Sequence, residues 1–304
     1  RCAAAKMLSM RASWKLGDVV SFQEMVGATP ADGWFGPTSI ATWKAWSRTL
    51  SPPVAPGKGM IVSGSALIGG QWFAPPDGVT IVNHREPGGI PANLDDTSPR
   101  TRKPTQLVIH RGAETHMKGE NFAQATERIL DARGLSGVWS QNVDGVFYQH
   151  FDPAEIRGRH CTHHNSTSDS VDVGGPFTAT TKPLPGQVLR TVMMAIGRSN
   201  DGKPPKARKM VPLKCWSMPP GQAKALALFL PWWCRIRGIP VRACSDLRTW
   251  RVGGLGLEDP ATYVPGILGH GQVAGPGERV DGFLELLQLQ ELGADIEWRE
   301  DFFA

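Results

Sequence analysis

The run Gln106-Leu107-Val108-Ile109-His110 constrains the fold most, because it is an uninterrupted apolar strand that ends in a histidine. A strand with one solvated face alternates apolar and polar side chains, whereas a continuous apolar run indicates burial on both faces. Helical spacing over residues 122–133, 222–237 and 283–292 supplies helices that could cover both faces. We therefore expect an α/β domain with a mixed central sheet flanked by helices.

Turn signals and biased segments refine this expectation. The segment Asn142-Val143-Asp144-Gly145 predicts a β-hairpin that leads into residues 145–149. Residues 60–105 and 195–220 are rich in glycine, proline and basic residues, and we expect them to be extended loops or insertions.

The first 50 residues are expected to form a separate small all-α module. Apolar residues in 19–26 suit one helix face, Asp32-Gly33-Trp34-Phe35-Gly36-Pro37-Thr38 predicts a turn, and residues 40–48 predict a second helix. Residues 51–59 form a proline- and glycine-rich linker. The expected domains are therefore the module at 1–50, the linker at 51–59 and the α/β domain at 60–304.

This module resembles the family of three-helix peptidoglycan-binding domains. The resemblance runs from Phe22-Gln23 through the turn at residues 32–37 to Trp46. It implies that Trp34 and Phe35 bind wall sugars, since aromatic rings offer flat apolar faces. The same two rings could equally form the core of so small a unit.

Composition excludes several classes of protein. The formal net charge of +5 is spread along the chain without a basic stripe, so no nucleic-acid partner is expected. No apolar run is long enough for a membrane span. Five cysteines without a CxxC pair fit neither a zinc ribbon nor a disulfide framework, and we expect free buried thiols. A bridge between Cys234 and Cys244 is the alternative.

Two histidines and an aspartate form a candidate metal set. His110 ends the apolar strand, His270 lies in Gly269-His270-Gly271, and Asp281 follows eleven positions later. Two imidazoles and one carboxylate suit a catalytic Zn²⁺ whose fourth position is left for water. From the residues alone, a structural role for a histidine at a strand end stays open.

Residues 108–281 resemble the N-acetylmuramoyl-L-alanine amidase family, which includes peptidoglycan recognition proteins and T7-type phage lysozyme. The matching elements, in family order, are Val108-Ile109-His110, the hairpin at 144–149, His160 with Asn165-Ser166-Thr167-Ser168, Gly269-His270, and Arg279-Val280-Asp281. The resemblance implies that His110, His270 and Asp281 are the zinc ligands.

The resemblance also suggests catalytic roles. Arg279 stands where the family usually has lysine and is expected to stabilise the oxyanion. Trp139 falls where the family often has a tyrosine base, and an indole cannot titrate. Glu114 and Asp172 are the remaining candidates for the general base. His160 is expected to line the substrate groove or to pass a proton to the leaving amine.

Three further positions have two interpretations each. Asn165 binds substrate or holds its own loop, and Tyr148 and Trp139 line a glycan groove or belong to the core. The run His160-Cys161-Thr162-His163-His164 offers an independent metal site, but neighbouring residues on a strand point to opposite faces. The groove interpretation of His160 is simpler.

We therefore expect a zinc-dependent amidase that cleaves the bond between N-acetylmuramic acid and L-alanine in peptidoglycan. Without a recognisable signal peptide in the given sequence, a phage lytic enzyme fits, either a free endolysin or a virion component with virion proteins as partners. It would pass from the host cytoplasm to the periplasm and cell wall, or remain with the virion. The alternatives are a non-catalytic peptidoglycan binder and a structural virion or tail component on an amidase fold.

Overall fold

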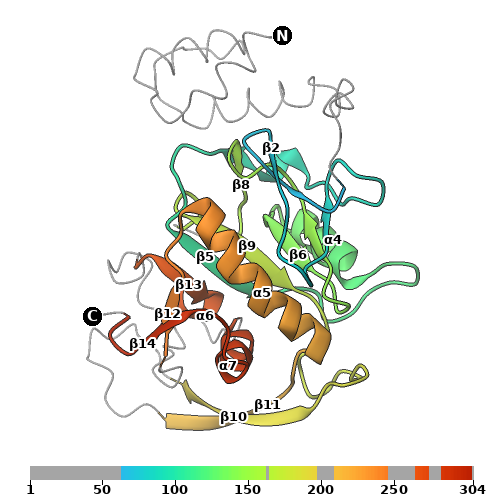
Figure 1. The fold of residues 1–304 in the computed structure, drawn as a ribbon. Coiled ribbons are helices and arrows are strands. Elements are labelled where there is room, and N and C mark those ends of the chain that lie inside the picture. The colour runs from blue at the N-terminus through green and yellow to red at the C-terminus, as the bar shows by residue number, and fades with distance from the viewer. Residues whose placement is uncertain (1–62, 162–163, 197–208, 246–263, 274–281, 303–304) are drawn as a thin grey trace, which may run out of the picture.

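The computed structural model describes residues 63–161, 164–196, 209–245, 264–273 and 282–302, and a mixed six-stranded sheet forms its centre (Figure 1). In spatial order the strands are β13 (Gly266–Gly269), β5 (Gln106–Arg111), β9 (Ser168–Val173), β6 (Trp139–Gln141), β7 (Phe147–Gln149) and β3 (Ile81–Asn83). The first four are mutually parallel, β6 and β7 form the predicted antiparallel hairpin, and β3 is parallel to β7. The expected fold class, a mixed sheet flanked by helices, is confirmed.

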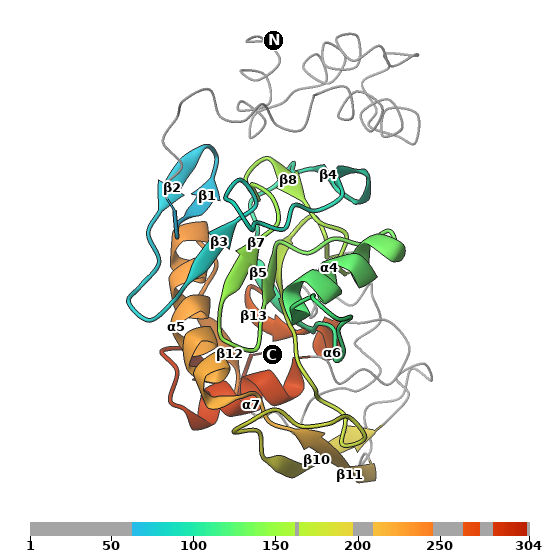
Figure 2. The same ribbon diagram turned by 90° about the vertical axis from the view of Figure 1, so that its right-hand side faces the viewer.

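Helices cover both faces of this sheet (Figure 2). On one face lie α5 (Pro220–Arg237) and α7 (Phe283–Glu291), and on the other lies α4 (Phe122–Ala132). The start of α4 is fixed by a capping box, in which Asn121 and Gln124 each accept a hydrogen bond from the other's backbone amide. Gly238 ends α5 in the left-handed conformation, with φ of 71°. All three helices match the predicted ranges within two residues.

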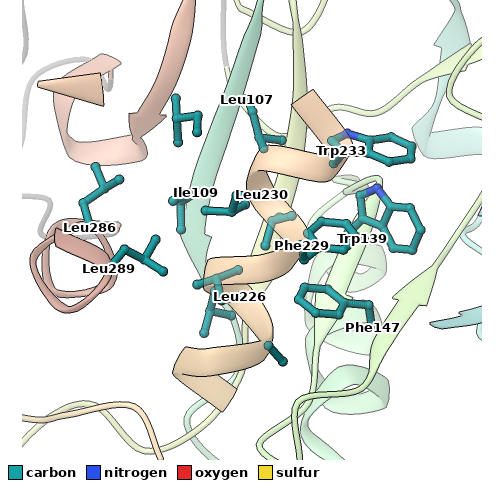
Figure 3. Packing of buried hydrophobic residues seen from close by; sticks show 14 of the residues in the cluster. Leu107, Ile109, Trp139, Phe147, Leu226, Phe229, Leu230, Trp233, Leu286 and Leu289 are labelled. Carbon is teal, nitrogen blue, oxygen red and sulfur yellow. The ribbon is translucent and has the colours of Figure 1, made fainter. Parts of the chain in front are cut away.

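The main apolar core lies between the sheet and α5 (Figure 3). Leu107 and Ile109 point from β5 into this core, where the rings of Phe147 and Phe229 stack with centroids 3.9 Å apart. Val108 points the other way and joins a smaller buried cluster. The strand is therefore buried on both faces, as its apolar run predicts.

Four two-stranded sheets surround this centre. They are β1 (Ala66–Ile68) with β2 (Gln71–Phe73), β4 (Ser98–Pro99) with β8 (Ile156–Arg157), β10 (Leu189–Ile196) with β11 (Lys209–Trp216), and β12 (Arg242–Cys244) with β14 (Glu297–Arg299). The short helices are the 3-10 helix η2 (Leu94–Asp96) and α6 (His270–Val273). The expectation of extended loops at 60–105 and 195–220 is thus wrong in part, since β3 joins the central sheet and β11 pairs along eight residues.

Four cysteines lie within the described residues; all four are buried and none forms a disulfide, Cys234 and Cys244 included. The alternative of a bridge between these two is therefore wrong. In the described part of the chain, no helix combines the length and apolarity that a membrane span needs. The expected module at 1–50, with Trp34 and Phe35, and the linker at 51–59 lie outside the described residues.

Candidate functional site

Three histidines meet at one edge of the central sheet. His110 is near the end of β5, and His270 directly follows β13, the parallel neighbour of β5. Parallel neighbours end at the same edge, so the two rings lie with centroids 4.3 Å apart. His160 completes the group, with its Nδ1 3.1 Å from Nε2 of His110. All three residues are at most 7% exposed, so the cluster is shielded from bulk water.

The position of His160 is set by its own loop. Asn165 Oδ1 accepts hydrogen bonds from the backbone amides of His160 and Cys161, so Asn165 holds the loop, one of its two predicted roles. Ser168 Oγ lies 3.1 Å from His160 Nε2. Burial lowers the pKa of His160 to about 3, helped by the charge of His270. His160 is therefore a neutral imidazole at neutral pH.

Asp172 lies beside this cluster, at the end of the central strand β9. In the register of the sheet it is the neighbour of His110 on one side and of Ser140 on the other. Val171 and Val173 face the α5 core, so Asp172 points to the opposite face, as His110 does. A Cβ at Gly137 would collide with Asp172 Oδ2, so only glycine permits this approach. Of the two predicted bases, Asp172 is the one that the sheet places next to a predicted ligand.

The other predicted site residues have different surroundings. Glu114 accepts hydrogen bonds from the backbone amide and hydroxyl of Thr178, at 3.0 and 2.9 Å. The hydroxyl of half-buried Tyr148 accepts a hydrogen bond from Asn121. Trp139 is fully buried and packs edge-on against Phe229. The prediction that Trp139 lines a glycan groove is therefore wrong, because alternation along β6 turns its ring into the α5 core.

The run 160–164 divides between two environments. Cys161 packs in the buried cluster that contains Val108. His164 Nδ1 lies 3.0 Å from Gln106 Oε1, at the opposite end of β5 from His110. His163 lies outside the described residues. The rings of His160 and His164 thus contact different side chains, His110 and Ser168 for the first and Gln106 for the second.

The donor chemistry of the cluster fits zinc, which prefers imidazole nitrogen and carboxylate oxygen in catalytic sites. His110 and His270 are the two predicted ligands that the structure brings together. Arg279 and the predicted third ligand, Asp281, lie outside the described residues, and no group of three metal-ligating side chains occurs within the described ranges alone. Gly282, which follows Asp281 in the sequence, packs against backbone atoms of Ile109, Gly269 and His270.

A second polar layer lies under α4 and was not predicted. Glu127 on α4 is 6% exposed and approaches His150, which in turn contacts Ser140 in β6. The sequence did contain one signal. Glu127 stands four residues after Ala123 and three before Leu130, so it occupies the apolar face of the predicted helix.

Comparisons with protein-family models, with curated proteins and with solved structures give no match.

Proposed function

We propose that this chain is a zinc-dependent hydrolase of the amide between N-acetylmuramic acid and L-alanine in bacterial peptidoglycan. The observation that carries the proposal is the meeting of His110, His160 and His270 beside Asp172 at the carboxyl edge of parallel strands. These residues are far apart in the sequence, and they are the ones that the amidase resemblance groups together. The position of Gly282 against the ends of β5 and β13 supports Asp281 as the third ligand.

Each residue then has a defined task. His110, His270 and Asp281 would hold the metal, which supplies a Lewis acid and lowers the pKa of a bound water. Asp172 accepts the proton of the attacking water on its carboxylate and returns it to the departing amine of L-alanine. His160, neutral and fixed by Asn165 and Ser168, orients His110 through the contact between their ring nitrogens. Arg279 would stabilise negative charge on the carbonyl oxygen.

The test is the release of new L-alanine amino groups from purified peptidoglycan, with and without a chelator. We expect release that the chelator abolishes and added Zn²⁺ restores. His270→Ala should lose both bound zinc and activity. The control, His116→Ala, removes an exposed histidine and should keep both. Release of reducing sugar ends instead would indicate a glycosidase, and binding to sacculi without any release would favour the non-catalytic binder.

We further propose that the wall is reached as part of a phage lytic cycle, with the module at 1–50 as the wall-binding unit. Deletion of residues 1–59 should weaken sedimentation with sacculi more than it slows cleavage of a small soluble muropeptide. Unchanged sedimentation would refute the wall-binding role of Trp34 and Phe35.

A further inference from the structure

Glu127 is a buried acid without a hydrogen-bond partner among the described residues. It lies on the face of α4 that covers the sheet, and neither carboxyl oxygen has a hydrogen bond within the described part of the chain. Burial of an ionised carboxyl group in such a place is costly, and a protein usually avoids that cost by keeping the acid protonated. Glu127 therefore needs an explanation beyond packing.

A neighbouring histidine cannot neutralise Glu127. His150 Nε2 lies 3.7 Å from Glu127 Oε2, which is longer than a hydrogen bond. His150 Nδ1 lies 2.6 Å from the carbonyl oxygen of Ile90, which can only accept, so Nδ1 carries the ring proton. Nε2 then accepts from the hydroxyl of Ser140, 2.5 Å away. Burial lowers the pKa of His150 to about 4, so this ring is neutral at neutral pH.

The polar layer under α4 also contains Asp172. Ser140 and Asp172 are register neighbours on β6 and β9, and both point to the face that α4 covers. The next neighbour of Asp172 in that row is His110. Glu127 therefore lies on the far side of Asp172 from the histidine cluster.

Within the described part of the chain, the charges that raise the pKa of Glu127 come from acidic groups. They are Asp172 from β9, Asp131 from the same helix and Asp96 from η2. Burial raises the pKa of Glu127 to about 8, and the negative charge of Asp172 adds to the effect.

We propose that Glu127 is a positioning residue for Asp172, and that Glu127 stays protonated at neutral pH beneath the polar row that Asp172 belongs to. A neutral Glu127 then adds no further negative charge on the side of Asp172 that faces away from the histidine cluster. Two carboxyl groups in a poorly hydrated site behave in this way because both cannot ionise cheaply. This role rests on the proposed function, in which Asp172 moves the proton of the attacking water.

A carbon-13 titration of the glutamate carboxyl groups in the zinc-loaded full chain tests the proton directly. One carboxyl should titrate at about pH 8, should be missing in Glu127→Gln and should persist in Glu120→Gln, which changes a partly exposed glutamate just before the same helix. Asp172→Asn should lower the midpoint by about one pH unit, because a neighbouring charge is removed. Titration of Glu127 with the surface glutamates, or a midpoint that Asp172→Asn leaves unchanged, would overturn the proposal. The parent and Asp172→Asn spectra decide this even if Glu127→Gln fails to fold.

The pH dependence of kcat/KM separates positioning from a purely structural role. The parent should lose activity as pH rises through about 8, where Glu127 ionises beside Asp172. Glu127→Gln should abolish that transition, and Glu120→Gln should keep it. A transition that persists in Glu127→Gln would refute the positioning role. If no variant hydrolyses the amide, the proposed function fails, while the carbon-13 titration still decides whether Glu127 holds the proton.

Discussion

Replacement of Gly282 by alanine should disturb both the fold and the histidine cluster. Gly282 precedes α7 with φ of +86°, and an added Cβ would lie 2.5 Å from Gly269 Cα and 2.7 Å from the carbonyl oxygen of Ile109. Both are backbone atoms of strands in the six-stranded sheet, so no side chain can rotate away to make room. The strand ends or the start of α7 must move.

Two separate costs add in Gly282→Ala. A left-handed backbone at a residue with a Cβ costs about 1–2 kcal/mol. Forcing an extra carbon into a packed contact costs about 1–3 kcal/mol. The free energy of unfolding should therefore fall by about 2–5 kcal/mol. Urea denaturation measures this fall, and the dependence of the unfolding free energy on urea concentration should not change. Affinity for Zn²⁺ at the proposed site should fall as well, because the displaced backbone carries His110 and His270.

Gly293→Ala is the matched control. Gly293 also has a positive φ, +65°, but an added Cβ there would meet no atom within 4 Å. It should incur only the conformational cost of about 1–2 kcal/mol and leave zinc affinity unchanged. Equal losses of stability in the two variants would refute the reasoning, since the backbone contacts of Gly282 would then contribute nothing.

Three further substitutions test the described interactions. Asp169 is fully buried between Arg100 and Arg237, so Asp169→Asn should cost about 3–5 kcal/mol in urea denaturation. Although burial alone would raise the pKa of Asp169, the two arginines lower it, so this stabilisation is present above the ordinary carboxyl pKa and is lost as pH falls through the folded value. Glu127→Gln should raise stability by about 3 kcal/mol at pH 7 and hardly at pH 4, because the folded pKa of about 8 exceeds the ordinary 4.5, so that ionisation of the unfolded chain lowers the parent's stability progressively as pH rises from 4.5 to 8. A difference in thermal unfolding between the parent and Glu127→Gln that does not change with pH would contradict this prediction. Trp139→Ala should cost about 3–5 kcal/mol, whereas a groove-lining tryptophan would lose little stability.

Local periodicity predicted the elements in which the apolar spacing and the residues at the ends indicate the same structure. The strand at 106–110 and the helices at 122–133 and 222–237 have the right apolar spacing and clear ends, such as Gly238 after α5. Strand β11 was missed because Pro212 stands within it, and proline removes a hydrogen-bond donor. It is tolerated there because β11 belongs to a two-stranded sheet rather than to the central one.

The candidate site was predictable only as a set of residues. The resemblance grouped His110, His160 and His270, but their contact depends on the pairing of β5 with β13 and β9, which are distant in the sequence. The choice between Glu114 and Asp172 depended on the same pairing. Spacing along the chain gives no register between separate strands, so only the structure places Asp172 next to His110.

The two faces of the sheet explain why such a site can exist within a stable domain. The face under α5 is filled by large apolar side chains, including Trp139, Phe147 and Phe229, and it accounts for most of the buried core. The opposite face carries a row of polar side chains, His110, Asp172 and Ser140, on the same three strands. Because alternate residues of one strand serve the two faces, β5, β9 and β6 are held rigidly by the apolar side while their polar side chains stay in register. Substitutions in the α5 face should therefore lower stability first, and substitutions in the polar row should change chemistry before they change the fold.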